Sequence, residues 1–409
     1  MAATERMSAR ELRAAAGLAG IFGLRMFGLF AILPVFALYA GTLEGGSDLS
    51  LVGIALGAYG LAQALMQIPF GRWSDRVGRK PALYTGLAVF AAGSFVAGYS
   101  DSIYGVIAGR IVQGAGAISA VAIAMAADLT RDEHRTKAMA IIGSMIGVAF
   151  AASLVLGPWL NRHIGVPGIF TLIGVLALAA MAIVASLPAP EERSSSESPA
   201  SIIFGDIFSD RELNRLNAGI FVLHAVLMSL FVTVPFDLVA AGMDSAGHWT
   251  IYAAVMFGAL LYMAPCVYFG DRRGYRKTVF LGSIALVGTS QVMLMGLGRD
   301  VLGLGIALLV FFSGFMVLEA ALPAQVSRAA PRGGRGAAIA VYSTAQFLGA
   351  FCGGALGGFL MQHFGRGSLF TVNTIMLVIW FVAATKMRII GNLRASNHPI
   401  PPIDRDQVI

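Results

Sequence analysis

The chain has 409 residues, of which 57% are hydrophobic and 12% charged, and its mean hydropathy is +0.76. Soluble domains carry about 25% charged residues, so this composition excludes a water-soluble protein and indicates a chain that lies mostly within a membrane. The net charge of +7 does not indicate a nucleic-acid partner, because the Lys and Arg residues are spread over alternate loops rather than gathered in one patch.

Apolar stretches of about 20 residues, the length that crosses a bilayer as a helix, recur along the whole chain. The first is too long for a cleaved signal peptide and contains Arg25, so we expect it to remain as a helix. The pattern predicts an all-α membrane protein with twelve transmembrane helices, at 15–40, 50–70, 81–99, 103–126, 138–160, 167–187, 214–240, 249–269, 278–297, 301–326, 337–360 and 367–389.

A longer polar segment divides these helices into two groups of six. We therefore predict four regions: an N-terminal six-helix bundle over 1–190, a cytoplasmic linker over 191–212, a C-terminal six-helix bundle over 213–390 and a cytoplasmic tail over 391–409.

The basic residues predict the orientation of the chain in the membrane. If the N-terminus is cytoplasmic, 24 of the 29 Lys and Arg residues fall in cytoplasmic segments, and the outer loops hold only Arg162, Arg299 and Arg366. Cytoplasmic loops are enriched in Lys and Arg. We therefore expect both termini in the cytoplasm and a location in a bacterial inner membrane, with lipid as the partner of the outer surface.

The two groups of helices resemble each other at an offset of about 200 residues. Arg25, in AGIFGLR, corresponds to His224, in AGIFVLH. Parallel repeats of this kind place a substrate site between the halves near the middle of the bilayer, where one half can rock on the other. We therefore expect two pseudo-symmetric bundles. Further matches at an offset of 200 support this expectation: Leu160, His163, Gly165 and Phe170 correspond to Leu360, His363, Gly365 and Phe370.

A polar loop after the second predicted helix reads GRWSDRVGRK at 71–80. It resembles the signature loop of the major facilitator superfamily (MFS) without a departure, and a weaker copy, VYFGDRRGYRK, follows the eighth helix at 267–277. Small residues here favour close helix contact at Gly71 and a tight turn at Gly78. The motif positions are Gly71, Asp75, Arg76, Gly78, Arg79 and Lys80 in the first copy, and Asp271, Arg272, Gly274, Arg276 and Lys277 in the second.

The resemblance implies a role for the loop in the transport cycle. In the superfamily, a charge network at this place latches the outward-facing state. In this chain the resemblance assigns that network to Asp75, Arg79 and Asp128, the last at the cytoplasmic end of the fourth helix. A basic loop that only sets the topology would explain Arg72 and Lys80 equally well.

Two further motifs refine the family resemblance. RIVQGAG at 110–116 resembles a second signature of the superfamily, and LGPWL at 156–160 is similar to the Gly-Pro core of a motif associated with antiporters. Ser153 stands where the antiporter motif has a glycine. Segments 24–36, 127–140 and 223–236 look most like the YajR-type branch of bacterial drug-efflux-like members, some of which carry a further C-terminal domain that we do not expect after Arg388.

Ionisable residues inside the predicted helices are candidates for function, because each costs about 2.5–3.5 kcal/mol to insert into a bilayer. They fall on the first, fourth, seventh and tenth helices, which line the cavity in the superfamily. Histidine, and a carboxyl group shielded from water, can exchange protons near neutral pH. The proton-coupling candidates are His224, Glu319 and, near the outer end of its helix, Asp237.

Other polar positions within the helices are candidates for the substrate cavity. Arg25 could bind an anionic or polar group, or exchange charge with Glu319, or instead form a structural ion pair or bond to carbonyl groups around Pro34. Tyr59 and Gln346 could equally join helices by hydrogen bonds. The cavity candidates are Arg25, Arg110, Gln113, Tyr59 and Gln346.

These patterns together predict a secondary active transporter that works by alternating access, with a small-molecule substrate and a proton gradient as its partners. No phosphate-binding loop of the GxxxxGK[ST] type occurs, which excludes ATP hydrolysis by this chain. We expect a monomeric proton-coupled exporter of amphipathic or drug-like molecules, with no enzymatic activity, no cofactor and no metal. A proton symporter or uniporter of a metabolite, and a membrane sensor or scaffold, remain alternatives.

Overall fold

The computed structural model describes residues 7–188, 200–297, 300–331 and 334–387, except the side chains of residues 132, 136, 200–204 and 271–273. These ranges fold into helices without a strand. Their bounds are α1 Ala9–Phe30, α2 Leu33–Ala40, α3 Leu49–Val77, α4 Arg79–Gly98, α5 Ile103–Ala115, α6 Ile118–Asp128, α7 Asp132–Ser186, α8 Ala200–Ser209, α9 Arg211–Ala240, η1 Ser245–Gly247, α10 His248–Arg273, α11 Arg276–Leu297, α12 Val301–Ala329 and α13 Arg335–Thr385.

The helices account for twelve passages through a membrane. In the described residues ten spans are long and apolar enough to cross a bilayer, counting α1 with α2 and α5 with α6 as one span each. Two of the ten, α7 and α13, have 55 and 51 residues, and each is interrupted by a glycine with positive φ, Gly165 at 67° and Gly365 at 75°. Because each is long enough for two crossings, the predicted twelve-helix fold is confirmed.

Two predicted helices are broken in the middle. The span at 15–40 divides into α1 and α2 at Ala31 and Ile32, just before Pro34, which lacks the amide hydrogen that a continuous helix needs. The span at 103–126 divides into α5 and α6 at Gly116 and Ala117, where Gly116 packs against the backbone of α4. Hydrophobicity predicts where a span lies and does not reveal these breaks.

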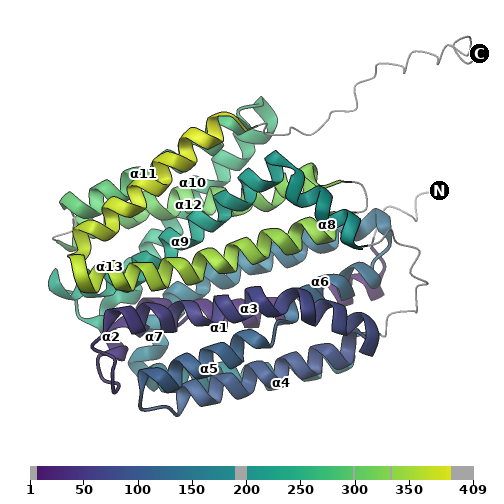
Figure 1. Ribbon diagram of the computed structural model, residues 1–409, viewed down its shortest axis with the longest axis horizontal. Helices are drawn as coiled ribbons and strands as arrows, with labels where there is room; N and C mark the ends of the chain where they lie inside the picture. Colours follow the sequence, from purple (N-terminus) through teal and green to yellow (C-terminus); the bar gives the residue numbers. More distant parts are fainter. Residues whose placement is uncertain (1–6, 189–199, 298–299, 332–333, 388–409) are drawn as a thin grey trace, which may run out of the picture.

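The two halves lie side by side, α1–α7 in one and α9–α13 in the other (Figure 1). They share local geometry at matched positions: the Nδ1 atom of His163 lies 2.7 Å from the Trp159 carbonyl oxygen, and that of His363 lies 3.0 Å from the carbonyl oxygen of Phe359. Each histidine ring also packs on the aromatic ring of that partner, with 4.5 Å between centroids. The repeat in the sequence is thus a repeat in structure.

We call the end at which α1 begins and α13 finishes the proximal end, and the opposite end, where α13 turns back, the distal end (Figure 1). Gly365 is the residue at which α13 turns, and Gly165 is its counterpart in α7. Toward the distal end α3 and α13 approach closely: a Cβ atom built on Gly53 would lie 2.0 Å from the Gly354 carbonyl oxygen. Nearer the proximal end, Gln67 Nε2 of α3 donates to the Ala340 carbonyl oxygen of α13 at 3.2 Å. The halves therefore meet along α3 and α13.

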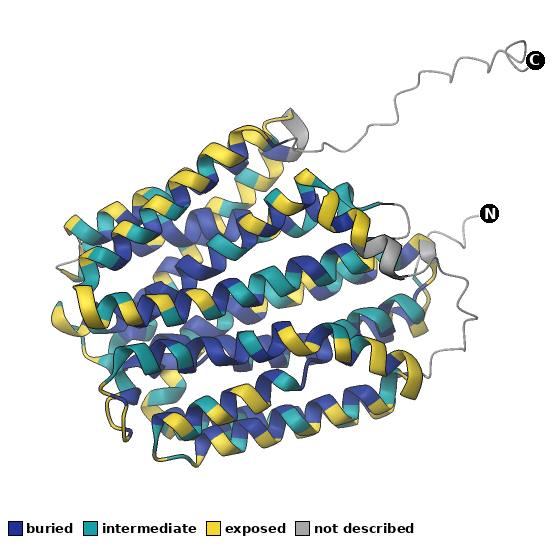
Figure 2. Ribbon diagram, viewed as in Figure 1, coloured by how far each residue is buried: buried dark blue, intermediate teal, exposed yellow. Residues whose placement is uncertain are grey.

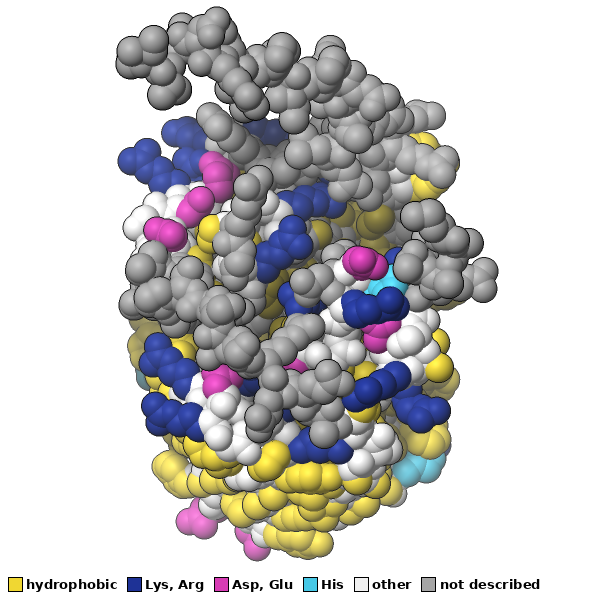
Figure 3. Space-filling model, turned by 90° about the vertical axis from the view of Figure 1, so that its right-hand side faces the viewer, with side chains coloured by type: hydrophobic (Ala, Val, Ile, Leu, Met, Phe, Trp, Pro, Cys, Tyr) yellow, Lys and Arg dark blue, Asp and Glu magenta, His cyan; other side chains and the backbone are white. Residues whose placement is uncertain are grey.

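Exposed residues run along the faces of both halves (Figure 2), and many of them are large hydrophobic residues. Leu65, Phe257 and Ile379 are each more than 60% exposed. Lys and Arg side chains are spread over the proximal end (Figure 3). This is the surface of a protein that contacts lipid along its sides.

The predicted linker at 191–212 contains a helix, α8, which packs beside α9 and α13. The N-cap Asp210 then starts α9 by accepting from the backbone amides of Glu212 and Leu213. The start of the linker and the tail at 391–409 lie outside the described residues.

Candidate functional site

A small cavity lies between the two halves. Helices α1 and α3 line it from one half, and α9 and α13 line it from the other. Three of the predicted residues share it, because Tyr59, His224 and Gln346 all contribute to its wall, and the rest of the lining is mostly apolar and includes Phe30, Met228 and Phe347. We call this space, with the polar groups that border it, the crevice.

A histidine and an amide line the crevice on the C-terminal side, and a carboxylate lies next to both of them. Gln346 Nε2 lies 2.8 Å from His224 Nε2 and donates to Glu319 Oε1 at 3.2 Å. His224 Nε2 is 3.9 Å from Glu319 Oε2, so the two side chains form an ion pair when the histidine is protonated. Glu319 Oε2 has no hydrogen-bond partner among the described residues. Helices α9, α12 and α13 thus bring together two of the three predicted proton-coupling residues.

Arg25 lies directly behind the wall of the crevice, against Tyr59 and Phe347, and is only 3% exposed. It donates to Ser119 Oγ of α6, and its guanidinium lies over the rings of Tyr59 and Phe347, 5.5 Å from each centroid. The alternative of hydrogen bonds to carbonyl groups around Pro34 is wrong, because the hydrogen-bond partner of Arg25 is Ser119. Ser119 was missed in the sequence, although it lies 200 positions before Glu319, as Arg25 lies 199 before His224.

Arg110 and Gln113 were expected in the cavity, but the structure buries both between α3, α4 and α5. Arg110 donates to the Ala55 and Leu56 carbonyl oxygens at 3.4 and 3.3 Å, and to Gln113 Oε1 at 2.7 Å. Gln113 Nε2 in turn donates to Ser94 Oγ at 2.8 Å. The carbonyl groups of α3 attract the guanidinium into the helix interface, so these two side chains join helices of one half.

Asp237 lies apart from the crevice. Arg366 Nη2 is 3.1 Å from Asp237 Oδ2 and donates to the Leu294 carbonyl oxygen at 2.9 Å. The pair joins α9 to α11 and α13 near the distal end. The structure therefore does not bring this third proton-coupling candidate to the other two.

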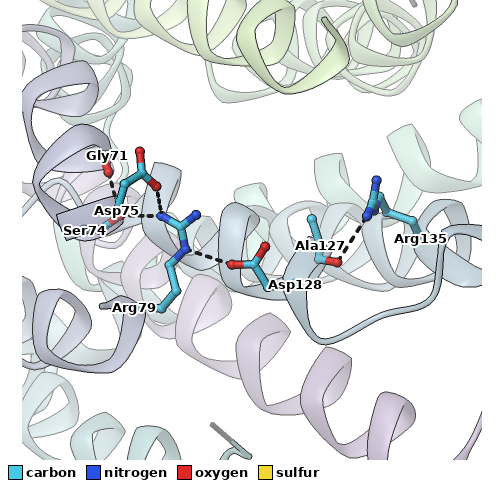
Figure 4. A network of polar contacts seen from close by, with 7 residues as sticks. All are labelled: Gly71, Ser74, Asp75, Arg79, Ala127, Asp128 and Arg135. Atoms are coloured by element: carbon cyan, nitrogen blue, oxygen red, sulfur yellow. Dashed lines mark hydrogen bonds and ion pairs between the residues drawn. The ribbon is translucent and has the colours of Figure 1, made fainter. Parts of the chain in front are cut away.

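The signature loop forms the charge network that the motif predicts (Figure 4). Arg79 pairs with Asp75, its Nε donates to Asp128 Oδ2 at 2.9 Å, and its Nη1 donates to Ser74 Oγ at 2.7 Å. Ser74 donates to the Gly71 carbonyl oxygen at 2.6 Å. One arginine thus joins the end of α3, the start of α4 and the end of α6.

The other signature positions differ in what they contact. Gly78 has a φ of 94°, the tight turn expected of it. A Cβ atom on Gly71 would meet Ala120 at 3.6 Å, an ordinary contact, so close packing does not require glycine there. Arg76 is exposed, and Lys80 Nζ donates to the Ala185 carbonyl oxygen at 3.4 Å.

The second copy of the loop repeats part of this arrangement. Gly274 has a φ of 78°, and Lys277 Nζ donates to the Thr385 carbonyl oxygen at 2.7 Å. In the first copy, Lys80 Nζ donates to the carbonyl oxygen of Ala185, which lies 200 positions before Thr385. Arg276 lines a groove between α10, α11 and α12. The side chains of Asp271 and Arg272 lie outside the described part.

In the part of the chain that the structure describes, no three His, Cys, Asp or Glu side chains gather as a metal site requires. The polar groups of the crevice can instead bind a polar molecule and exchange a proton.

A family model described as the Major Facilitator Superfamily matches residues 18–265 and 243–401. The chain belongs to the major facilitator superfamily. The predicted family is confirmed, and the chain is a multi-pass membrane transporter rather than an enzyme.

Known proteins resemble the chain over most of its length. It is 39% identical to the inner membrane transport protein YajR of Escherichia coli (strain K12), over 94% of this chain and 85% of that protein. It is 22% identical to the multidrug resistance protein MdtH of Aeromonas salmonicida (strain A449), over 83% and 85%. A crystal structure of a D-xylose-proton symporter shares the fold, with a TM-score of 0.68 and 15% identity over 93% of this chain and 98% of that one.

Proposed function

We propose that the chain is a proton-coupled exporter of small amphipathic or drug-like molecules. It acts as a monomer in a bacterial inner membrane, with both termini in the cytoplasm. The substrate binds in the crevice, and His224 and Glu319 carry the coupling proton. The relatives support this class of transport, since one is an inner membrane transport protein and another a multidrug resistance protein.

The proposal rests above all on the geometry of His224 and Glu319. An imidazole and a carboxylate lie 3.9 Å apart beside a cavity that both halves line. Histidine changes its charge near physiological pH, and an isolated charge within a bilayer is costly. Gain or loss of a proton here therefore changes the free energy of opening the crevice to water, which is what coupling requires.

Proteoliposomes that contain the full chain and an internal pH-sensitive dye test the proposal. Naphthalene-2-sulfonate, 2-naphthylmethanol and trimethyl(2-naphthylmethyl)ammonium serve as an anionic, a neutral and a cationic amphipathic probe. We expect at least one probe to move against protons under an imposed pH gradient, and Glu319→Gln to slow this exchange at least tenfold. Asp237→Asn, which changes a carboxylate outside the crevice, is the matched control and should retain it.

A proton symporter is the second candidate. Ser153 replaces the glycine of the antiporter motif, and its hydroxyl donates to the Ala149 carbonyl oxygen within α7 and lies 3.4 Å from the Phe27 carbonyl oxygen of α1. Movement of probe and protons in the same direction would favour a symporter.

If Glu319→Gln changed neither flux nor ligand affinity, a sensor or scaffold that has kept the fold would become the better explanation.

A further inference from the structure

Two buried guanidinium groups contact one tyrosine ring beside the crevice. The Cζ atom of Arg25 lies 5.5 Å from the centroid of Tyr59, and that of Arg110 lies 5.0 Å from it. Arg25 is 3% exposed, and both Arg110 and Tyr59 are fully buried. Positive charge is thus concentrated in the N-terminal half at the depth of the crevice.

Neither guanidinium forms an ion pair with a described carboxylate. Arg110 uses its donors on two carbonyl oxygens and on Gln113 within its own half. Arg25 has Ser119 as its hydrogen-bond partner, while its Nη2 atom and the Tyr59 hydroxyl are buried without one. An uncompensated buried charge destabilises a protein strongly, so a missing anion is the simplest explanation of an unfilled donor at this place.

The C-terminal half does not supply that anion in this arrangement. Among the described residues that border the crevice, Glu319 carries the negative charge, and it already accepts from Gln346 and faces His224. When His224 is protonated the pair is neutral, and the two arginines remain uncompensated. The N-terminal side of the crevice therefore carries positive charge, and the net charge of the C-terminal side is negative or zero.

The walls between these polar groups are apolar and aromatic. Phe30, Met228 and Phe347 line the cavity, and Phe347 also lies under the Arg25 guanidinium. When the halves part, such a surface can bury a flat apolar body, and the Arg25 guanidinium behind Tyr59 and Phe347 has an unfilled Nη2 donor for a carboxylate or sulfonate.

We propose that the crevice selects organic anions, with the acidic group held by Arg25 and the apolar body packed on Phe347 and Phe30. This inference rests on the proposed function, because it names the substrate class of the same site. It separates this chain from an exporter of lipophilic cations, for which a guanidinium beside the crevice would be repulsive.

Equilibrium binding to the full chain in detergent micelles tests the proposal without a proton gradient. Naphthalene-2-sulfonate and trimethyl(2-naphthylmethyl)ammonium have similar apolar bodies and permanent charges of opposite sign, so pH does not change their charge. Isothermal titration should show that the sulfonate binds at least tenfold more tightly than the ammonium compound. Arg25→Gln should weaken sulfonate binding by about 10- to 100-fold, the range for a hydrogen bond to a charged group.

Two further variants make the result specific. Arg25→Lys keeps the charge and should retain more affinity than Arg25→Gln, and Arg162→Gln removes an exposed distal arginine and should bind as the unaltered chain does. Equal binding of the two probes by the unaltered chain, which needs no variant to fold, would overturn the proposal, as would unchanged sulfonate binding in folded Arg25→Gln. Because no gradient is present, anion binding can succeed or fail independently of proton coupling.

Discussion

Arg110 illustrates how a buried charge can serve packing instead of transport. Its guanidinium donates to two carbonyl oxygens of α3 and to Gln113, and it lies over the Tyr59 ring. Helices α3 and α5 of the N-terminal half are thus joined by one planar group with donors in several directions, and Gln113 extends the contact to Ser94 of α4. Lysine carries the same charge but offers a single ammonium at the end of a flexible chain.

We therefore expect Arg110→Lys to destabilise the N-terminal half. The substitution leaves Gln113 Oε1 without its donor, and an unsatisfied buried group costs about 1–3 kcal/mol of the free energy of unfolding. The carbonyl oxygens of α3 keep their donors within the helix and lose only the additional contact with the guanidinium. Thermal unfolding of the purified chain, followed by its helical circular dichroism, should show a lowered Tm. Arg162→Lys, at an exposed distal position, should leave Tm unchanged, and equal Tm values for both variants would contradict the packing role.

At the same scale, the sequence showed which side chains lie within the membrane but not where they point. The cost of burying charge singled out Arg25, Arg110, His224 and Glu319, of which the first three are buried and Glu319 is half-buried beside His224. Whether a guanidinium turns toward the crevice or toward the carbonyl groups of a neighbouring helix depends on rotamer and helix rotation. Neither can be read from spacing along the chain, which is why Arg110 was placed in the cavity.

The contact between α3 and α13 depends on glycines on both helices. Gly53 and Gly354 oppose each other, and Gly358 lies one turn further along: a Cβ atom on Gly358 would be 2.2 Å from the Leu49 carbonyl oxygen. Such distances leave no room for a methyl group, and the opposing atoms are backbone atoms that cannot rotate away. The approach closes the distal end between the halves.

We expect Gly53→Ala to hold the distal end open. Spin labels on Thr42→Cys and Asp244→Cys, with Cys266 and Cys352 replaced, would report the distance between the halves there. The distribution should shift to longer distances, because the new Cβ atom would stand 2.0 Å from a carbonyl oxygen of α13. Gly147→Ala is the matched control, since a Cβ atom there meets nothing within 4 Å; an identical distribution for both variants would show that α3 and α13 part by other means.

The charge network around Arg79 makes a second prediction about elements. The family resemblance suggests that it latches the outward-facing state, and the structure shows Arg79 joining α3, α4 and α6 through Asp75, Ser74 and Asp128. The network is already formed here, where α3 and α13 close the distal end, so a latch must be stronger in the distal-open state. Asp128→Asn should then reduce the distal-open population by up to about fivefold, the full effect of losing a partly exposed ion pair worth about 0.5–1 kcal/mol. The same pair of spin labels measures it.

Arg76→Gln removes a charge from the same loop at an exposed position and is the control for the latch. Its distance distribution should match that of the unaltered chain. If Asp128→Asn and Arg76→Gln behaved alike, the network would serve only to fix the loop.

Elements proved more predictable than side chains. The apolar runs located all twelve crossings, because only a helix satisfies its backbone groups within lipid. The same runs do not reveal the breaks at Ala31 and Gly116. They also gave no sign that α7 and α13 are each helical on both sides of a single glycine at the distal end. These features depend on tertiary packing and on one backbone conformation, to which hydropathy is insensitive.

The molecule as a whole consists of two halves that share one arrangement of helices and have diverged in charge. Arg25 and Ser119 in one half occupy the places of His224 and Glu319 in the other. The duplication gives a site that both halves share, and the divergence gives it a fixed cationic group on one side and a titratable pair on the other. A molecule bound between them contacts both kinds of group, so its binding and the protonation of the pair influence each other.

Orientation in the membrane is the last property of the whole molecule that the charges predict. The proximal end bears most of the Lys and Arg residues, and Arg162 and Arg366 are the described basic residues at the distal end. Moving such a basic end across the membrane during insertion is unfavourable, so we expect the proximal end to face the cytoplasm. In intact cells, a membrane-impermeant thiol reagent should label Thr42→Cys at the distal end, and label Arg76→Cys only after the cells are opened. The reverse pattern would place the signature loop outside, and neither its assignment as a cytoplasmic latch nor the export direction would then hold.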